Sequence, residues 1–244
     1  MRESVFLARH NVRNSRQLLH MTAALPLFML ACGSSPPPSG GAKYVTADWT
    51  SEPPRSGGAI VNLGVTQGSL LFVAILGNGT FDTASVSDDH QNDYVEITGG
   101  SSGGTVAGKY FFAINRAFDT INLALMWPPT LTNVVVLTAE YTGISAAAPL
   151  DTAATSFGNG SAIDCGAIAT TNANDSILLL AFGAPGTFSG ASGYLTEPFP
   201  LNPNSTRPVT LQLQVVHSTD RYSVSLTDSV SGPWLCLMAA FRNQ

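Results

Sequence analysis

The sequence has few charged residues, and those beyond residue 32 are mostly acidic. Charged side chains make up 11% of the 244 residues, and the formal net charge is −5. Four arginines and one glutamate precede residue 32, which leaves seven basic and fifteen acidic residues after it and a net charge of about −8 there. Nucleic-acid phosphates require basic patches, so this balance argues against a nucleic-acid partner. It also gives no polybasic surface for anionic lipid.

Residues that carry catalytic chemistry are scarce as well. No CxxC pair occurs, so thiol redox chemistry and zinc clusters lack their usual signature. Beyond the N-terminal region, His90 and His217 are the histidines available to a catalytic triad. Residues 100–104 (GSSGG) match the G-x-S-x-G pattern, but no helix follows them, so we interpret them as a hairpin loop. These absences favour a protein that is not an enzyme.

No apolar run is long enough for a permanent transmembrane helix. Residues 21–31 (MTAALPLFMLA) are apolar, but Pro26 interrupts them, and a spanning helix needs about 20 residues. Arginines precede this run and a small residue ends it, which predicts a cleaved export signal over residues 1–31. We expect a Pro/Gly/Ser-rich tether over residues 32–57 and a folded domain over residues 58–244.

The end of the signal resembles the lipobox of bacterial lipoproteins. It reads Met29-Leu30-Ala31-Cys32, with Met29 where lipoboxes usually place leucine. The resemblance implies that Cys32 carries diacylglycerol and anchors the protein to a membrane. Gly33 follows, whereas the retention signal of inner-membrane lipoproteins is an aspartate at that position. The resemblance therefore implies an outer-membrane or cell-surface location.

The two remaining cysteines form an even pair. Cys165 and Cys236 would lie in an oxidising compartment, which favours a disulfide between them. Two buried free thiols are the alternative, since cysteine is among the most buried residue types.

Short apolar or alternating runs recur from residue 58 onward, separated by Gly, Pro, Asn and Asp. Residues 70–75 and 177–182 are apolar on both faces and should be central strands. Residues 210–215 and 222–226 alternate between apolar and polar residues and should have one solvent-exposed face. This pattern predicts an all-β fold, a two-sheet β-sandwich of jelly-roll type with about twelve strands. The expected strands lie near 59–64, 69–76, 84–87, 94–98, 108–115, 120–127, 132–141, 166–170, 176–183, 209–217, 221–227 and 233–242.

Several of these runs resemble a β-sandwich module that recurs in predicted bacterial extracellular proteins. The similarity lies in residues 134–143 (VVVLTAEYTG), 149–151 (PLD), 170–175 (TTNAND) and the closing strand 234–242, with 68–71 and 85–88 extending it. It covers most of residues 58–242. The resemblance implies the fold and an extracellular setting, and it assigns no catalytic residue.

The most polar stretch of the body is residues 88–93 (DDHQND). Asp88, Asp89 and Asp93 offer the hard oxygen ligands that Ca²⁺ prefers. A polar turn between two strands explains the same residues, because Asp and Asn are favoured in turns for backbone hydrogen bonding. No other cofactor is indicated. Among the isolated glutamates, Glu140 interrupts an apolar strand, but nothing in the sequence pairs it with a second carboxylate, as glycosidase chemistry requires.

Three aromatic residues are candidates for stacking on sugar rings. They are Trp127 beside two prolines, Tyr194 in a Gly-rich loop, and Phe188. Trp234 and Phe111 are expected in the core. We therefore expect a surface-anchored lipoprotein whose sandwich binds an extracellular glycan or another cell-envelope component. The alternatives are a polysaccharide-active enzyme of jelly-roll fold and a structural subunit of a surface assembly; the sequence leaves the oligomeric state open.

Overall fold

The computed structural model describes residues 43–50, 57–81, 83–102, 105–197 and 208–244. Residues 39–244 form one compact unit, and the described part contains thirteen β-strands and no helix. No described segment is therefore a helix that could cross a membrane. The predicted all-β sandwich class is confirmed. The predicted export signal and Cys32 lie outside the described residues.

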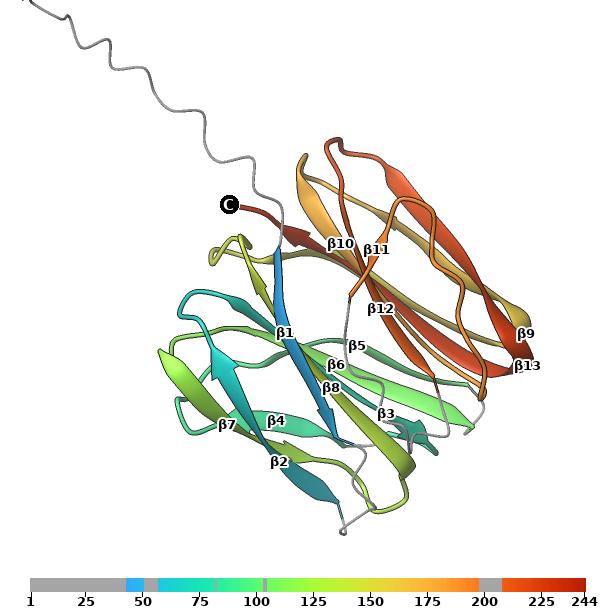
Figure 1. The fold of residues 1–244 in the computed structure, drawn as a ribbon, viewed down its shortest axis with the longest axis horizontal. Coiled ribbons are helices and arrows are strands. Elements are labelled where there is room, and N and C mark those ends of the chain that lie inside the picture. The colour runs from blue at the N-terminus through green and yellow to red at the C-terminus, as the bar shows by residue number, and fades with distance from the viewer. Residues whose placement is uncertain (1–42, 51–56, 82, 103–104, 198–207) are drawn as a thin grey trace, which may run out of the picture. The chain divides into compact units, whose positions relative to one another are not determined.

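Three antiparallel sheets share the strands, where two were expected. Figure 1 shows them as stacked layers, with the N-terminal strands and the C-terminal strands on different sides. The central sheet has the order β1 (Lys43–Thr50), β8 (Thr132–Thr142), β3 (Leu70–Asn78), β6 (Val106–Ile114), β5 (Val95–Ser102). The C-terminal sheet has the order β11 (Leu195–Thr196), β12 (Val209–Val215), β10 (Asp175–Phe182), β13 (Arg221–Arg242), β9 (Leu150–Ala169). The small sheet has the order β2 (Gly58–Val65), β7 (Asp119–Met126), β4 (Ser85–Asp88).

The central sheet is buried on both faces. One face packs on the C-terminal sheet through a core that includes Leu70, Phe72, Leu178 and Leu180. Its other face packs on the small sheet through a second core, to which β3 contributes residues of the opposite parity. β3 and β10 are the middle strands of their five-stranded sheets, as their doubly apolar sequences predicted. Each fully buried Leu, Ile or Phe contributes about 1.5–3 kcal/mol of stabilisation, so these strands anchor the fold.

β9 and β13 form a long antiparallel pair that bends over its own sheet. Residues 150–160 of β9 pair with residues 232–241 of β13, and residues 162–169 pair with residues 221–227 after a register shift. The bent half carries Ile163 to the outer face of the C-terminal sheet, where a third core forms. The predicted strands 221–227 and 233–242 are thus one continuous strand.

The polar side of β12 is not exposed to solvent, which corrects the prediction for residues 210–215. Thr210 and Gln212 are buried, because the segment before β11 covers that face. The Gln212 side chain accepts a hydrogen bond from the Ala191 backbone N–H (2.8 Å) and donates to the Ser189 carbonyl (3.3 Å). The alternating half of β13 does have one exposed face, as predicted.

β1 lies inside the segment that we predicted as the tether. It pairs with β8 from Lys43↔Thr142 to Thr50↔Val136. The folded body therefore begins upstream of residue 58. Gly100, Ser101 and Ser102 continue β5 and pair with β6, so this part of the G-x-S-x-G stretch lies in a strand and not in a strand-to-helix elbow.

Candidate functional site

A pocket of about 430 Å³ opens at the end of β7, beside the start of β4. Antiparallel pairing places Ser85 opposite Met126, and Lys109 comes from β6 of the central sheet. Ligand pockets commonly have volumes of roughly 300–1,000 Å³, so the size suits a small ligand or one unit of a longer one. The pocket is lined by Thr83, Ala84, Ser85, Lys109, Met126 and Trp127.

Trp127, one of the predicted stacking residues, forms a wall of this pocket. Its residue exposure is only 6%, and it belongs to the core between the central and small sheets. Its backbone N–H donates to the Gly57 carbonyl (3.0 Å), and the buried indole Nε1 has no hydrogen-bond partner among the described residues. Trp127 therefore offers a ligand only a small exposed part of a ring held by packing, and not a free-standing stacking face.

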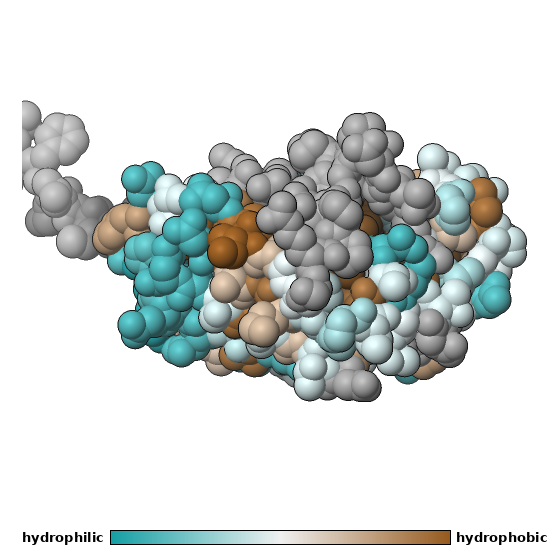
Figure 2. All heavy atoms as spheres, turned by 90° about the horizontal axis from the view of Figure 1, so that it is seen from below, coloured by the Kyte–Doolittle hydropathy of each residue, from teal (hydrophilic) through white to brown (hydrophobic). Residues whose placement is uncertain are grey.

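Met126 supplies the exposed apolar surface of the pocket. It is 63% exposed and points away from the core, because side chains alternate along β7. Figure 2 shows one face of the molecule, on which apolar side chains appear as separate patches among hydrophilic ones. Isolated apolar positions of this kind suit a ligand with both apolar and polar groups better than a broad apolar interface.

Lys109 is the charged residue of the pocket. Its ammonium donates to both carboxylate oxygens of Glu96, at 2.7 and 2.8 Å, and its side chain is 18% exposed. Glu96 lies on β5, the neighbouring strand. The pair places donors and acceptors next to each other with no net charge.

Tyr194 and Phe188 do not share a site with Trp127. Both are half-buried and pack against the third core, on the outer face of the C-terminal sheet. Phe188 forms an isolated bridge with Asp228, and burial raises the pKa of the Tyr194 hydroxyl. The three predicted aromatics therefore occupy two regions of the molecule and do not form a single platform.

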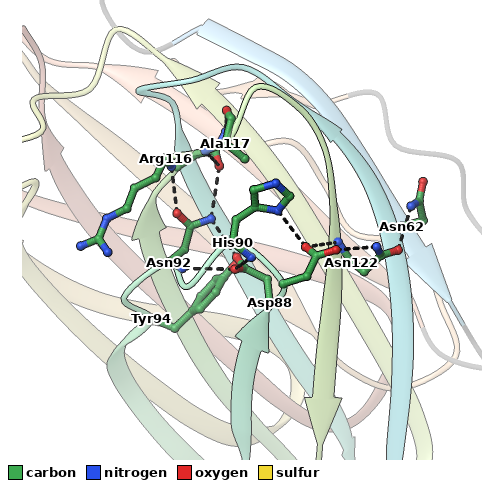
Figure 3. A network of polar contacts seen from close by, with 10 residues as sticks. Asn62, Asp88, His90, Asn92, Tyr94, Arg116, Ala117 and Asn122 are labelled. Atoms are coloured by element: carbon green, nitrogen blue, oxygen red, sulfur yellow. Dashed lines mark hydrogen bonds and ion pairs between the residues drawn. The ribbon is translucent and has the colours of Figure 1, made fainter.

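Asp88 of the polar stretch closes a turn between β4 and β5 (Figure 3). Its carboxylate accepts hydrogen bonds from the backbone N–H groups of His90 (2.9 Å) and Asn92 (3.1 Å), the Asn92 amide (2.7 Å) and the Tyr94 hydroxyl (2.8 Å). Burial raises the pKa of Asp88, but these hydrogen bonds outweigh it and lower the pKa overall. The arrangement is that of a polar turn, which was one of the two predicted interpretations.

Asp89 and Asp93 point to other partners. Asp89 accepts from the backbone N–H (3.0 Å) and side-chain amide (2.6 Å) of Asn122, and these bonds lower its pKa. Asp93 pairs with the Arg116 guanidinium. Figure 3 shows the Asn122 amide in turn receiving a bond from Asn62 (2.9 Å). The three carboxylates of the predicted Ca²⁺ site thus serve different protein donors, and the described residues hold no group of three His, Cys, Asp or Glu side chains arranged for a metal ion.

The isolated glutamates of the body have structural partners or are buried. Glu140 is 1% exposed and accepts a hydrogen bond from the Thr66 backbone N–H (2.5 Å), so it neither faces solvent nor lines the pocket. Glu197 is 9% exposed, and burial raises its pKa to about 7. A different pair of carboxyl groups, those of Asp151 and Asp175, lies in contact at the end of the C-terminal sheet. This contact could not be predicted from the sequence, because the two positions are 24 residues apart.

Cys165 and Cys236 are joined in a disulfide, with 5.2 Å between their Cα atoms. Both residues are fully buried in the third core. Cys236 is paired in register with Ser156, so the bridge does not link neighbours in the ladder. It connects the bent half of β9 to the sheet that this half covers.

Comparison with known proteins gives no match: no family model, curated protein or solved structure is similar to the chain. The class of protein that the fold defines is an antiparallel three-sheet β-sandwich. The resemblances to the lipobox and to the bacterial extracellular module stay predictions.

Proposed function

We propose that this protein is a surface-anchored lipoprotein whose sandwich binds an extracellular glycan or another cell-envelope component without catalysis. In this proposal lipid on Cys32 holds the protein to the outer membrane or cell surface, and the pocket beside Trp127 is the binding site. The pocket is the observation that carries the proposal, because it is lined by a residue type that the sequence marked for sugar contact.

The chemistry of the pocket fits a sugar unit. A pyranose has apolar C–H faces and a rim of hydroxyl groups that both donate and accept hydrogen bonds. Met126 and the exposed part of Trp127 offer apolar contact, and Ser85, Thr83 and Lys109 offer polar groups.

Charge favours a neutral ligand over an anionic one. Glu96 already neutralises Lys109, and the chain beyond residue 32 has a net charge of about −8 by formal count. A uronic acid or phosphate group would have to displace Glu96 from Lys109 in a protein of like charge. The proposed ligand is therefore a neutral glycan.

The carboxylate pair does not favour the polysaccharide-active enzyme. Glycosidases hold their two carboxyl groups about 5–9.5 Å apart across the sugar. Asp151 and Asp175 are in hydrogen-bond contact, they are buried, and neither lines the pocket.

A glycan-array screen of the purified protein, with mass spectrometry of the bound glycans, tests the proposal. The informative variant is Met126→Glu, which alters an exposed pocket residue without touching the core. Phe118→Glu is the matched control: Phe118 is 73% exposed and lies just before β7, roughly 25 Å along the strand from Met126.

We expect wild type and Phe118→Glu to bind the same neutral glycan, and Met126→Glu to bind it at least about tenfold more weakly, a loss of about 1.4 kcal/mol. Equal binding by all three proteins would remove the pocket from the proposal. Cleaved glycan in the mass spectrum would establish the enzyme instead, and no binding to any glycan would favour the structural role.

A further inference from the structure

Three ionisable side chains meet at one end of the C-terminal sheet. Asp151 comes from the start of β9, Asp175 from the start of β10, and Arg242 from the end of β13. Asp175 and Arg242 are register partners, and the Arg242 Nη2 donates to Asp151 Oδ1 at 2.8 Å. The side chain of Asp151 and the whole of Asp175 are 0% exposed, and the two carboxyl groups are in hydrogen-bond contact.

Hydrogen-bond donors are shared very unequally between the two carboxyl groups. Asp151 accepts from the Thr171 backbone N–H (2.5 Å), the Thr171 hydroxyl, the Asn172 amide (3.1 Å) and Arg242. Neither oxygen of Asp175 receives a hydrogen bond from any donor among the described residues. Asp151 thus has the hydrogen-bond donors that stabilise an ionised carboxylate, and Asp175 does not.

Two buried carboxylates with one arginine between them leave an uncompensated negative charge. Burying an unpaired charge is costly, and two carboxylates in contact repel each other, so one of them holds a proton. The unequal distribution of hydrogen-bond donors decides which of the two carboxyl groups is protonated. A protonated Asp175 needs no donor, and its own O–H supplies Asp151 with one more hydrogen bond.

We infer that Asp175 is a neutral carboxylic acid that donates its proton to Asp151, and that this shared proton is a pH-sensitive clamp on the ends of β9, β10 and β13. Burial, reinforced by the hydrogen bond and charge of Asp151, raises the pKa of Asp175 to about 7. Burial also acts to raise the pKa of Asp151, but the Thr171 and Arg242 hydrogen bonds outweigh it and hold that pKa at about 2.

The clamp holds the connection between two sheets. Residues 143–149 link β8 of the central sheet to β9 of the C-terminal sheet, and Arg242 organises this link. Its guanidinium donates to the Ala148 carbonyl (3.0 Å), its backbone N–H donates to the Pro149 carbonyl (2.8 Å), and its carbonyl accepts from the Ser145 N–H (2.7 Å). The first residue of β1, Lys43, is the register partner of Thr142, at the end of β8 where the link begins.

The direction of the response follows from the charges. Below pH about 7, one proton and one arginine balance the two carboxyl groups, and the clamp is closed. Above it, Asp175 ionises beside Asp151, and the repulsion loosens the three strand ends and the link to the central sheet. Asp151 and Arg242 are the charged groups that act on Asp175; His217, which follows β12, is held to the neighbouring residue by contact with the side chain of Asn174 (3.0 Å).

Two measurements on the full chain test the clamp. Carboxyl-carbon NMR of protein labelled with ¹³C-aspartate follows the titration of each Asp between pH 3 and pH 9. Hydrogen exchange, corrected for the intrinsic pH dependence of the exchange rate, follows the amides of Ser176 and Arg242. Asp175→Asn keeps the shape of the protonated acid and a donor for Asp151, and Asp220→Asn, at an exposed position near the same sheet, is the control.

We expect one Asp carbon of wild type and of Asp220→Asn to titrate near neutral pH, and this signal to be missing from Asp175→Asn. We also expect protection at both amides to fall about tenfold per pH unit above that midpoint in wild type and control, and to stay constant in Asp175→Asn. The inference is wrong if every Asp carbon of wild type has titrated below pH 5, a result that needs no variant. It is equally wrong if protection is independent of pH in wild type or falls with pH in Asp175→Asn.

Discussion

The ring of Trp234 lies directly over Gly158. The two residues are register partners in the antiparallel β9–β13 pair, and a Cβ atom on Gly158 would lie 2.4 Å from Trp234 Cζ2. Trp234 is 7% exposed and belongs to the third core. An aromatic ring covering a glycine on the neighbouring strand keeps the strand packed where the glycine has no side chain.

Gly158→Ala should therefore destabilise the protein. The added methyl group has no room unless Trp234 leaves its position in the third core, and overpacking of this kind costs about 1–3 kcal/mol. Denaturant unfolding monitored by tryptophan fluorescence measures the loss. Gly190→Ala is the matched control, because nothing lies within 4 Å of the added atom, and its unfolding midpoint should not decrease. An unchanged midpoint in Gly158→Ala would show that the ring moves aside freely.

Removal of the disulfide should lower stability through the unfolded chain. Cys165 and Cys236 are 71 residues apart, and closing a loop of that length stabilises a protein by about 2–5 kcal/mol. The double change of Cys165 and Cys236 to Ala should lower the thermal midpoint, and calorimetry measures it. Alkylation followed by intact-mass analysis gives an independent check: the oxidised wild type should show no alkylated thiol at these two positions, and modification of both would show that they are not bridged.

The strands that could be predicted are those whose sequences are apolar on both faces or alternate over a whole strand. β3 and β10 are central, and each contributes to two cores through its two apolar faces. Most of β9 could not be predicted. It is rich in Ala, Ser, Thr, Gly and Asn, and pairing with β13 holds it in the sheet. The buried face of β12 was also missed, because the cover comes from a loop distant in sequence.

The candidate site was predictable only where its residues are close in sequence. The stretch from Asp88 to Asp93 gave a clear polar signal, although the sequence could not choose between a metal site and a turn. Trp127 lines the pocket, but Lys109 could not be placed there from the sequence, because it is the packing of the small sheet on the central sheet that brings it beside Trp127. Met126 precedes Trp127 in the sequence, but a single apolar residue does not indicate a pocket. The same holds for Asp151 and Asp175, whose contact depends on strand ends that meet in the sheet.

The Asn115 side chain should be more important for stability than its sequence indicates. It is 1% exposed, accepts from the Ala117 N–H (3.0 Å) and the Asn92 amide (3.2 Å), and donates to the Thr66 carbonyl (2.8 Å). Asn115→Ala leaves these groups buried without partners, which should cost about 1–3 kcal/mol of unfolding free energy. Asn62→Ala, which removes an exposed amide, should change the free energy by no more than about 0.5 kcal/mol. Urea unfolding of both variants measures the difference, and equal effects would contradict the buried role.

Stability should decrease as pH rises from about 4.5 to about 7. Glu197 is buried without a charged partner among the described residues, and burial raises its pKa from 4.5 to about 7. In this pH window the unfolded chain has released the Glu197 proton and the folded chain still holds it. Folding therefore takes up a proton, and each rise in pH opposes folding. Asp175 acts in the same direction, with a folded pKa of about 7 against 3.8. Below about pH 4 the sign reverses, because Asp151 has a folded pKa of about 2 and its contribution to stability is lost as it is protonated.

Urea unfolding at intervals between pH 3 and pH 8 should therefore give a maximum of the unfolding free energy near pH 4 to 5. Glu197→Gln should reduce the decline between pH 4.5 and 7, and the double variant with Asp175→Asn should remove most of it. A decline that survives in the double variant would mean that other groups set the pH dependence.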